Sequence, residues 1–176
     1  VHSLRLLPSS PLQYTAGDVL SVMPRNAPSS ITSLLSVLPP SISSIIDQTI
    51  SITPTSAAKS RVVNWPSPIT LRDLLAHCAD ITALPSRETL WYLSHFVIGG
   101  GGPSEMRDKL VELSGAAGSA LYEDYVVRER RDLAKVLYDF DCVGRDPAFT
   151  VERLLTLLGG MGGMRPREFS IASSPS

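Results

Sequence analysis

The apolar residues of this chain change their spacing twice, and this change constrains the fold more than any other feature. Residues 19–24 follow a Gly17-Asp18 turn and are rich in β-branched and apolar side chains, which is typical of a strand. From Ser30 onward apolar residues recur at i, i+3, i+4 and i+7, the spacing of one helix face. Residues 169–173 again alternate apolar and polar side chains. The sequence therefore predicts strands near both ends and a helical region between them.

Start and stop signals divide the helical region into segments. Thr70 with Asp73 matches an N-terminal capping box, and Ser86 follows Pro85 as the cap of the next helix. We place the cap of the first helix at Ser29 or Ser30. The predicted helices cover residues 31–38, 42–49, 71–78, 86–96, 104–113 and 150–158, the last ended by the glycines at 159–163, and two further strands are predicted at 3–7 and 12–14.

Composition excludes several classes of function. A net charge of -1 and a pI near 6.3, with no basic run, argue against a nucleic-acid surface. The sequence has no run of about 18 apolar residues, so we predict no membrane span in this chain. Its 176 residues can bury one sizeable core or two small ones.

The cysteines and histidines do not predict a metal site. Cys78 and Cys142 are far apart, without C-x-x-C spacing or an adjacent histidine, so we interpret both as free, reduced core thiols. His77 and His95 lack partner carboxylates and are predicted to be surface or structural residues. The four glycines at 99–102 lack the Lys-Ser/Thr that a phosphate-binding P-loop requires, so we interpret them as a linker.

Residues 165–174 (Arg-Pro-Arg-Glu-Phe-Ser-Ile-Ala-Ser-Ser) combine two cations, an aromatic ring and three hydroxyls. If residues 167–171 form a strand, Arg167, Phe169 and Ile171 share one face. A guanidinium binds phosphate oxygens, a ring stacks on a heterocycle, and a hydroxyl can hydrogen-bond to its edge. These groups suit a flat aromatic cofactor joined to phosphates. The alternative is an ordinary edge strand with a surface arginine.

Arg167-x-Phe169-Ser170, continued by Ile-Ala-Ser-Ser, resembles the R-x-[YF]-S signature of flavoprotein reductases of the ferredoxin-NADP reductase type, in particular the diflavin reductases. The resemblance implies that Arg167 binds the FAD pyrophosphate, that Phe169 lies against the isoalloxazine, and that Ser170 is the catalytic contact near its reactive nitrogen. It places Glu168 among the cofactor-binding residues too. Most relatives have tyrosine at position 169, so only stacking carries over to Phe169.

Three other segments resemble the same reductases. Residues 14–26 are similar to Y-x-x-G-D-x-[LV]-x(3)-P-x-N, which builds early strands of the FAD-binding barrel, and residues 80–87 to a connecting-domain segment. Residues 121–137 are similar to the segment Y-x-x-[YW]-V-x-x-x-R-R, in which the first arginine of the pair reaches FAD. That position is Arg130, and Arg131 is predicted to be a surface residue or part of an ion pair. The alternative is a solvated, charged helix face.

The resemblance implies an α+β fold, namely part of an antiparallel FAD-binding β-barrel of the ferredoxin-NADP reductase type with a large all-helical connecting insertion. We assign the N-terminal barrel strands to residues 1–28, the helical connecting domain to 29–160, and the return strand with the R-x-F-S motif to 161–176. The family's G-x-[CS]-[ST] segment is not in this sequence. We expect a fragment, truncated at both ends and inactive by itself.

The resemblance further implies the FAD-binding portion of an NADPH-dependent diflavin reductase, with FMN and NADPH bound in other domains. Electrons would pass from NADPH through FAD and FMN to a protein acceptor. The sequence of residues 165–174 is most similar to that of the reductase that serves an anamorsin-type iron-sulfur protein in cytosolic iron-sulfur cluster assembly. We expect a cytoplasmic location, with mitochondria as a second one. Cytochrome P450 reductase and sulfite reductase flavoprotein are the enzyme alternatives, and a non-catalytic helical interaction module is the alternative of another class.

Overall fold

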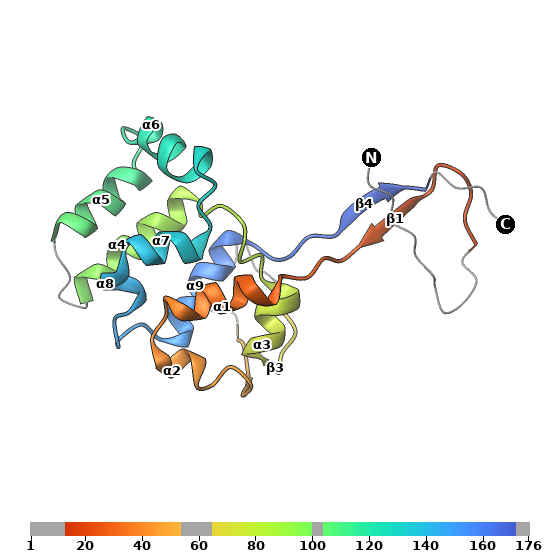
Figure 1. Cartoon of the computed structure of the whole chain (residues 1–176), viewed down its shortest axis with the longest axis horizontal. Coiled ribbons are helices and arrows are strands. Elements are labelled where there is room, and N and C mark those ends of the chain that lie inside the picture. Colours follow the sequence, from red (N-terminus) through yellow and green to blue (C-terminus); the bar gives the residue numbers. More distant parts are fainter. Residues whose placement is uncertain (1–12, 54–64, 100–103, 172–176) are drawn as a thin grey trace. The chain divides into compact units, whose positions relative to one another are not determined.

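A computed structural model describes residues 13–53, 65–99 and 104–171 of the protein (Figure 1). The chain divides into two compact units, one formed by residues 1–24 with 165–176 and the other by residues 25–164. We call them the ribbon unit and the helical unit. The strand predicted at 3–7, the linker residues 100–102 and the strand residues 172–173 lie outside the described part. So does residue 12 of the strand predicted at 12–14, and that prediction is wrong for residues 13–14, which form no strand.

The ribbon unit contains the two predicted strands on which the cofactor motif depends. β1 (Val19–Val22) pairs antiparallel with β4 (Arg167–Ser170), which Figure 1 shows as two paired arrows. The register places Leu20 opposite Phe169 and Val22 opposite Arg167. This pairing joins segments almost 150 residues apart in sequence, and the strands predicted from period two are confirmed at both places.

A tight turn leads into β1. Gly17 has a φ of 98°, a left-handed conformation that residues with a Cβ rarely adopt. The Asp18 carboxylate accepts a hydrogen bond from the Thr15 N–H at 2.7 Å, and the Ile171 N–H donates to the Asp18 carbonyl at 2.8 Å. The Gly17-Asp18 pair therefore shapes the turn and extends the β1–β4 pairing by one step.

The helical unit opens with α1 (Pro28–Ser36). Its N-cap residue is Ala27 and Pro28 takes the first helical position, where the missing N–H of proline costs nothing. The predicted cap at Ser29 or Ser30 is therefore wrong, because both serines lie inside the helix. The helix predicted at 42–49 is also shorter and earlier: α2 covers Pro40–Ser43, and the chain then passes through turns to β2 (Thr49–Ile50).

β2 pairs antiparallel with β3 (Ile69–Thr70), which runs directly into α3 (Leu71–Asp73) and the π-helix η2 (Leu74–Cys78). The predicted capping box is confirmed, since the Thr70 hydroxyl accepts a hydrogen bond from the Asp73 N–H at 3.1 Å and donates one to the Asp73 carboxylate at 2.8 Å. The cap satisfies one of the free N–H groups that every helix start leaves.

Two longer helices lie side by side in Figure 1: α4 (Arg87–Gly99) and α5 (Ser104–Ser114). The predicted cap of α4 is confirmed, because the Ser86 hydroxyl accepts a hydrogen bond from the Thr89 N–H at 3.2 Å. α4 also packs against α9 (Val151–Met161), which starts where predicted and has Thr150 as its N-cap. Gly159 does not end α9, which continues through both glycines to Met161.

The segment predicted to carry Arg130 begins with α6 (Ser119–Tyr122), which passes into the π-helix η3 (Glu123–Arg128). A bend at residues 129–132 leads to α7 (Leu133–Asp139), and α8 (Asp141–Gly144) follows. Asp132 caps α7 by accepting a hydrogen bond from the Lys135 N–H at 3.0 Å.

One apolar core holds the helical unit together. Its most buried side chains come from helices throughout this unit and include Leu34, Leu71, Leu90, Leu110, Leu133, Phe149 and Leu157. In contrast, none of the described residues of the ribbon unit is buried. Within the described ranges, no helix is both long and apolar enough to cross a bilayer.

Candidate functional site

The ribbon places Arg167 and Phe169 on one face. Side chains two apart on a strand point to the same side, and directly opposed residues of an antiparallel pair also share a side. Because Val22 faces Arg167 and Leu20 faces Phe169, these four side chains form one surface, which we call the motif face. The face shared by Arg167 and Phe169 is as the sequence predicts.

The motif face presents a ring and a cation to solvent. Phe169 is 51% exposed, so its ring is open to a ligand. Arg167 is exposed too, and within the described part of the chain its guanidinium has neither a side-chain hydrogen bond nor an ion pair. A free guanidinium next to a free aromatic ring can hold an anionic group and a flat heterocycle at the same time.

Ser170 and Glu168 lie on the opposite face of the ribbon. Ser170 faces Val19, and Glu168 faces Ser21. The structure therefore brings together two of the four motif residues and separates them from the other two. Both Ser170 and Glu168 are exposed, so each remains available to a ligand.

FAD carries two negative phosphates and a flat isoalloxazine, and the motif face supplies one complementary group for each. The Arg167 guanidinium can hold phosphate oxygens bidentately, while the exposed Phe169 ring offers a surface for stacking. The residues of this face fit the group that the sequence predicts.

Arg130 stands at the bend after η3, in the helical unit. Its φ is 49°, and it is the only residue other than glycine with a positive φ in the described ranges. Its side chain is exposed and makes no ion pair or side-chain hydrogen bond with any described residue. Arg130 therefore also presents an uncompensated guanidinium.

Arg131 behaves differently from its neighbour and forms an ion pair, as predicted. Its Nε and Nη2 atoms donate to Glu129 at 3.0 and 2.6 Å, and its Nη1 atom donates to Asp139. The guanidinium lies 4.5 Å from the centre of the Tyr125 ring, close enough for a cation–π interaction. The Tyr125 hydroxyl donates to Asp139 at 2.7 Å. Burial, together with this carboxylate, raises the pKa of Tyr125 far above its ordinary value, so the hydroxyl keeps its proton.

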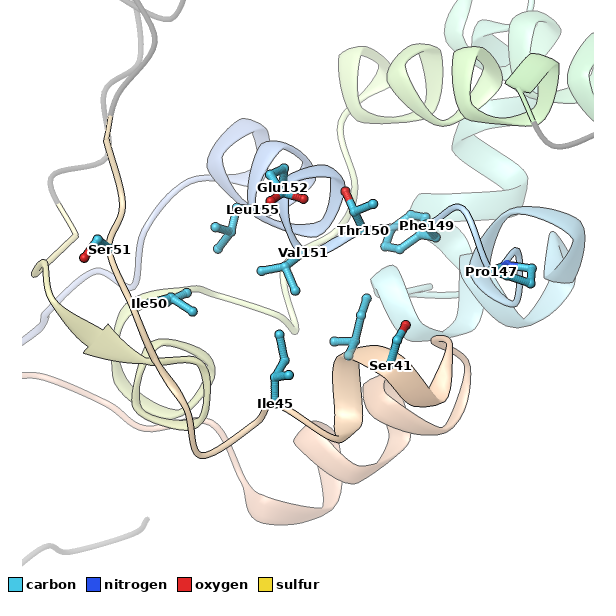
Figure 2. Close-up of a pocket in the computed structure, with 11 residues that line it drawn as sticks. Ser41, Ile45, Ile50, Ser51, Pro147, Phe149, Thr150, Val151, Glu152 and Leu155 are labelled. Atoms are coloured by element: carbon cyan, nitrogen blue, oxygen red, sulfur yellow. The ribbon is translucent and has the colours of Figure 1, made fainter.

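A cavity of about 610 Å³ in the helical unit is a feature that the sequence did not predict. Figure 2 shows Ile45 and Val151 on its two sides, with Glu152 and Leu155 farther along α9. Hydrogen bonding from Thr150 lowers the pKa of Glu152, so this carboxylate is ionised at neutral pH. The lining of the cavity comes from residues 41–51 and 147–155 and mixes aliphatic side chains with serine and threonine hydroxyls.

The sequence singles out Arg130 and the motif as candidates, and it does not identify Tyr125 and Asp139. Both residues stand where a charged, amphipathic helix pattern predicts solvated side chains, and no local signal identifies them as partners of Arg131.

The family described as FAD binding domain matches residues 6–176. Among curated relatives, an NADPH-dependent diflavin oxidoreductase 1 of Danio rerio is 31% identical over 94% of this chain and 26% of its own length. The protein of the same name in Emericella nidulans is 29% identical over 98% of this chain and 26% of its own length. The one in Mus musculus is 37% identical over 62% of the chain and 17% of its own length.

The chain thus spans about a quarter of the length of the first two of these relatives. The family match covers both the ribbon unit, with its exposed arginine and phenylalanine, and the helical unit. The chain belongs to the FAD-binding domain family.

Proposed function

We propose that this chain is the FAD-binding part of an NADPH-dependent diflavin reductase. The observation that carries the proposal is the motif face, where Arg167 and Phe169 stand side by side, exposed, on a strand whose sequence resembles the family's R-x-[YF]-S. The names of the relatives support the reaction class.

Each motif residue has a proposed role. Arg167 binds the pyrophosphate of FAD, and Phe169 packs its ring against the isoalloxazine. Ser170 is the proposed catalytic contact at the reactive edge of the flavin, and Glu168 is a further cofactor contact on the same strand. Arg130 is proposed as a separate contact to FAD, since its guanidinium is exposed and unpaired among the described residues. When bound, FAD supplies hydride and single-electron transfer chemistry.

The whole protein is proposed to accept electrons from NADPH and to pass them through FAD and FMN to a protein acceptor. We propose an anamorsin-type iron-sulfur protein as that acceptor and cytosolic iron-sulfur cluster assembly as the setting, because the lettering of residues 165–174 is most similar to the reductases of that process. The β1–β4 ribbon is proposed to be part of an antiparallel FAD-binding barrel.

Replacing Phe169 with alanine in the full-length protein tests the ring's role. Loss of stacking should weaken FAD binding roughly threefold to tenfold, because an aromatic pair contributes about 0.5 to 1.5 kcal/mol beyond its buried area. The flavin absorption band of the purified protein gives the FAD content, and fluorescence titration of the apoprotein gives the affinity.

Met23→Ala is the matched control. Met23 is 57% exposed in the same ribbon unit but follows β1, so it is not opposite any of the four motif residues. We expect wild-type FAD affinity for Met23→Ala. Equal losses in the two variants would show that the ribbon as a whole was disturbed, and wild-type affinity in Phe169→Ala would refute the stacking role.

A further inference from the structure

The backbone at Arg130 is held in a conformation that a non-glycine residue avoids. At a φ of 49° the Cβ of an L residue crowds its own backbone, so such residues persist only where the surroundings impose them. They are concentrated at functional sites. The π-helix η3, which ends just before this bend, is likewise a rare element found often at such sites.

Hydrogen bonds on both sides of Arg130 impose this conformation. The Arg130 N–H donates to the Val127 carbonyl at 3.2 Å, and the Arg131 N–H donates to the Val126 carbonyl at 3.0 Å. The Lys135 ammonium donates to the Arg130 carbonyl at 3.2 Å. The main chain at residue 130 is thus fixed from η3 on one side and from α7 on the other.

The side chain of Arg131 supplies a further restraint. It is 23% exposed and contacts Glu129, Asp139 and the Tyr125 ring, while Asp139 also accepts the Tyr125 hydroxyl. Asp139 therefore joins η3, the bend and the end of α7 through one carboxylate. Charge-assisted hydrogen bonds of this kind are about twice as strong as neutral ones.

These contacts leave Arg130 as the exposed member of the arginine pair. Arg131 is neutralised by the carboxylates of Glu129 and Asp139. Arg130 faces solvent, and no described residue compensates its charge. A bend that only connected two helices would be less strained with glycine or asparagine at this position. The arginine at this position carries that strain and presents a guanidinium that no described residue pairs with.

We propose that Asp139, together with Arg131 and Tyr125, is a positioning cluster that locks the bend and presents the Arg130 guanidinium to an anionic phosphate group of the cofactor. The inference rests on the proposed function, since the ligand is FAD. These three residues touch one another and the bend. They act on the ligand through Arg130.

A double-mutant cycle on the full-length protein tests this. Asp139→Asn keeps the shape of the side chain and removes its charge, and Arg130→Gly removes the guanidinium while fitting a φ of 49°. FAD affinity of each apoprotein is measured by fluorescence titration, and the thermal unfolding midpoint is measured alongside. We expect Asp139→Asn to weaken FAD binding at least about threefold when Arg130 is present and by less than about twofold in the Arg130→Gly background.

Asp124→Asn is the matched control. Asp124 pairs with Arg128 at 2.8 Å on the same π-helix, at an exposed position, and among the described residues Arg128 is its ion-pair partner in place of the Arg131 cluster. It should leave FAD affinity unchanged. If Asp139→Asn does not fold, Tyr125→Phe removes only the hydroxyl that donates to Asp139 and should give a smaller loss with the same dependence on Arg130.

The outcomes distinguish the positioning role of the cluster from the proposed FAD-binding function. Equal losses from Asp139→Asn in both backgrounds, or no loss at all, would overturn the positioning role and leave the flavin assignment intact. Unchanged affinity in Arg130→Gly would overturn Arg130 as a contact and the positioning role with it. A full-length protein that binds no FAD would overturn the proposed function itself.

Discussion

Asn26 is a buried residue that ties the start of the helical unit to the end of η2. Its side-chain amide donates to the carbonyls of Leu75 and Ala79, each at 2.6 Å, and its own N–H donates to the Ala76 carbonyl at 3.0 Å. These carbonyls lie at the end of η2, where the helix leaves acceptors free. One side chain thus satisfies acceptors about 50 residues away in sequence.

Asn26→Ala should lower the free energy of unfolding by about 1 to 3 kcal/mol, because the buried carbonyls of Leu75 and Ala79 each lose a donor, although the Ile81 N–H still donates to the Ala79 carbonyl at 3.1 Å. Urea denaturation followed by circular dichroism measures the change. Ser29→Ala is the control. Ser29 is exposed within α1 and caps nothing, so its replacement should cost less than about 0.5 kcal/mol. A cost of about 1 kcal/mol for Ser29→Ala would restore it as a cap.

At the scale of elements, three helix starts could be predicted from the sequence, whereas the start of α1 and the end of α9 could not. Thr70, Ser86 and Thr150 cap their helices through residues three positions away, so a local pattern contains all the information. The continuation of α9 through Gly159 depends instead on packing, since Leu154, Leu157 and Leu158 are buried in the core. Packing is a property of the whole unit and outweighs the weak helix propensity of glycine.

Gly159→Ala should therefore stabilise the protein. The position is helical, and nothing lies within 4 Å of a Cβ placed there. Replacing glycine in a helix with alanine gains about 0.5 to 1 kcal/mol, which a higher urea midpoint would show.

Gly144→Ala makes the opposite prediction. A Cβ at this position would lie 2.6 Å from the Val37 carbonyl oxygen, so the backbone would have to shift and stability should fall. If Gly159→Ala also lowered the midpoint, the helical end of α9 at Met161 would be contradicted.

In the candidate site too, the features set by local geometry could be predicted from the sequence, and those set by packing could not. Alternation along residues 167–171 was enough to predict that Arg167 and Phe169 share a face, because strand geometry fixes it. The pairing of β4 with β1 gives that face its second row, Leu20 and Val22. The Arg131 cluster could not be predicted, since Asp139 meets Tyr125 only once η3 and α7 have packed.

At the scale of the whole molecule, the core and the motif belong to different units. Every buried side chain of the described residues lies in the helical unit, and the ribbon unit has none. Substitutions of exposed motif residues should therefore change ligand binding while leaving the free energy of unfolding of the helical unit within about 0.5 kcal/mol. Because of this separation, a loss of FAD affinity in a motif variant can be measured without a loss of stability in the helical unit.

FAD titration of the Arg167→Ala apoprotein, in the full-length protein, tests the central claim most directly. A charge-assisted contact contributes on the order of 1.5 to 3 kcal/mol, so we predict a loss of affinity of roughly tenfold to a hundredfold. Arg107→Ala, which removes an exposed arginine from α5, should bind FAD as the wild type does. Wild-type affinity in Arg167→Ala would contradict the assignment of Arg167 to the pyrophosphate, and with it the motif face as the FAD site.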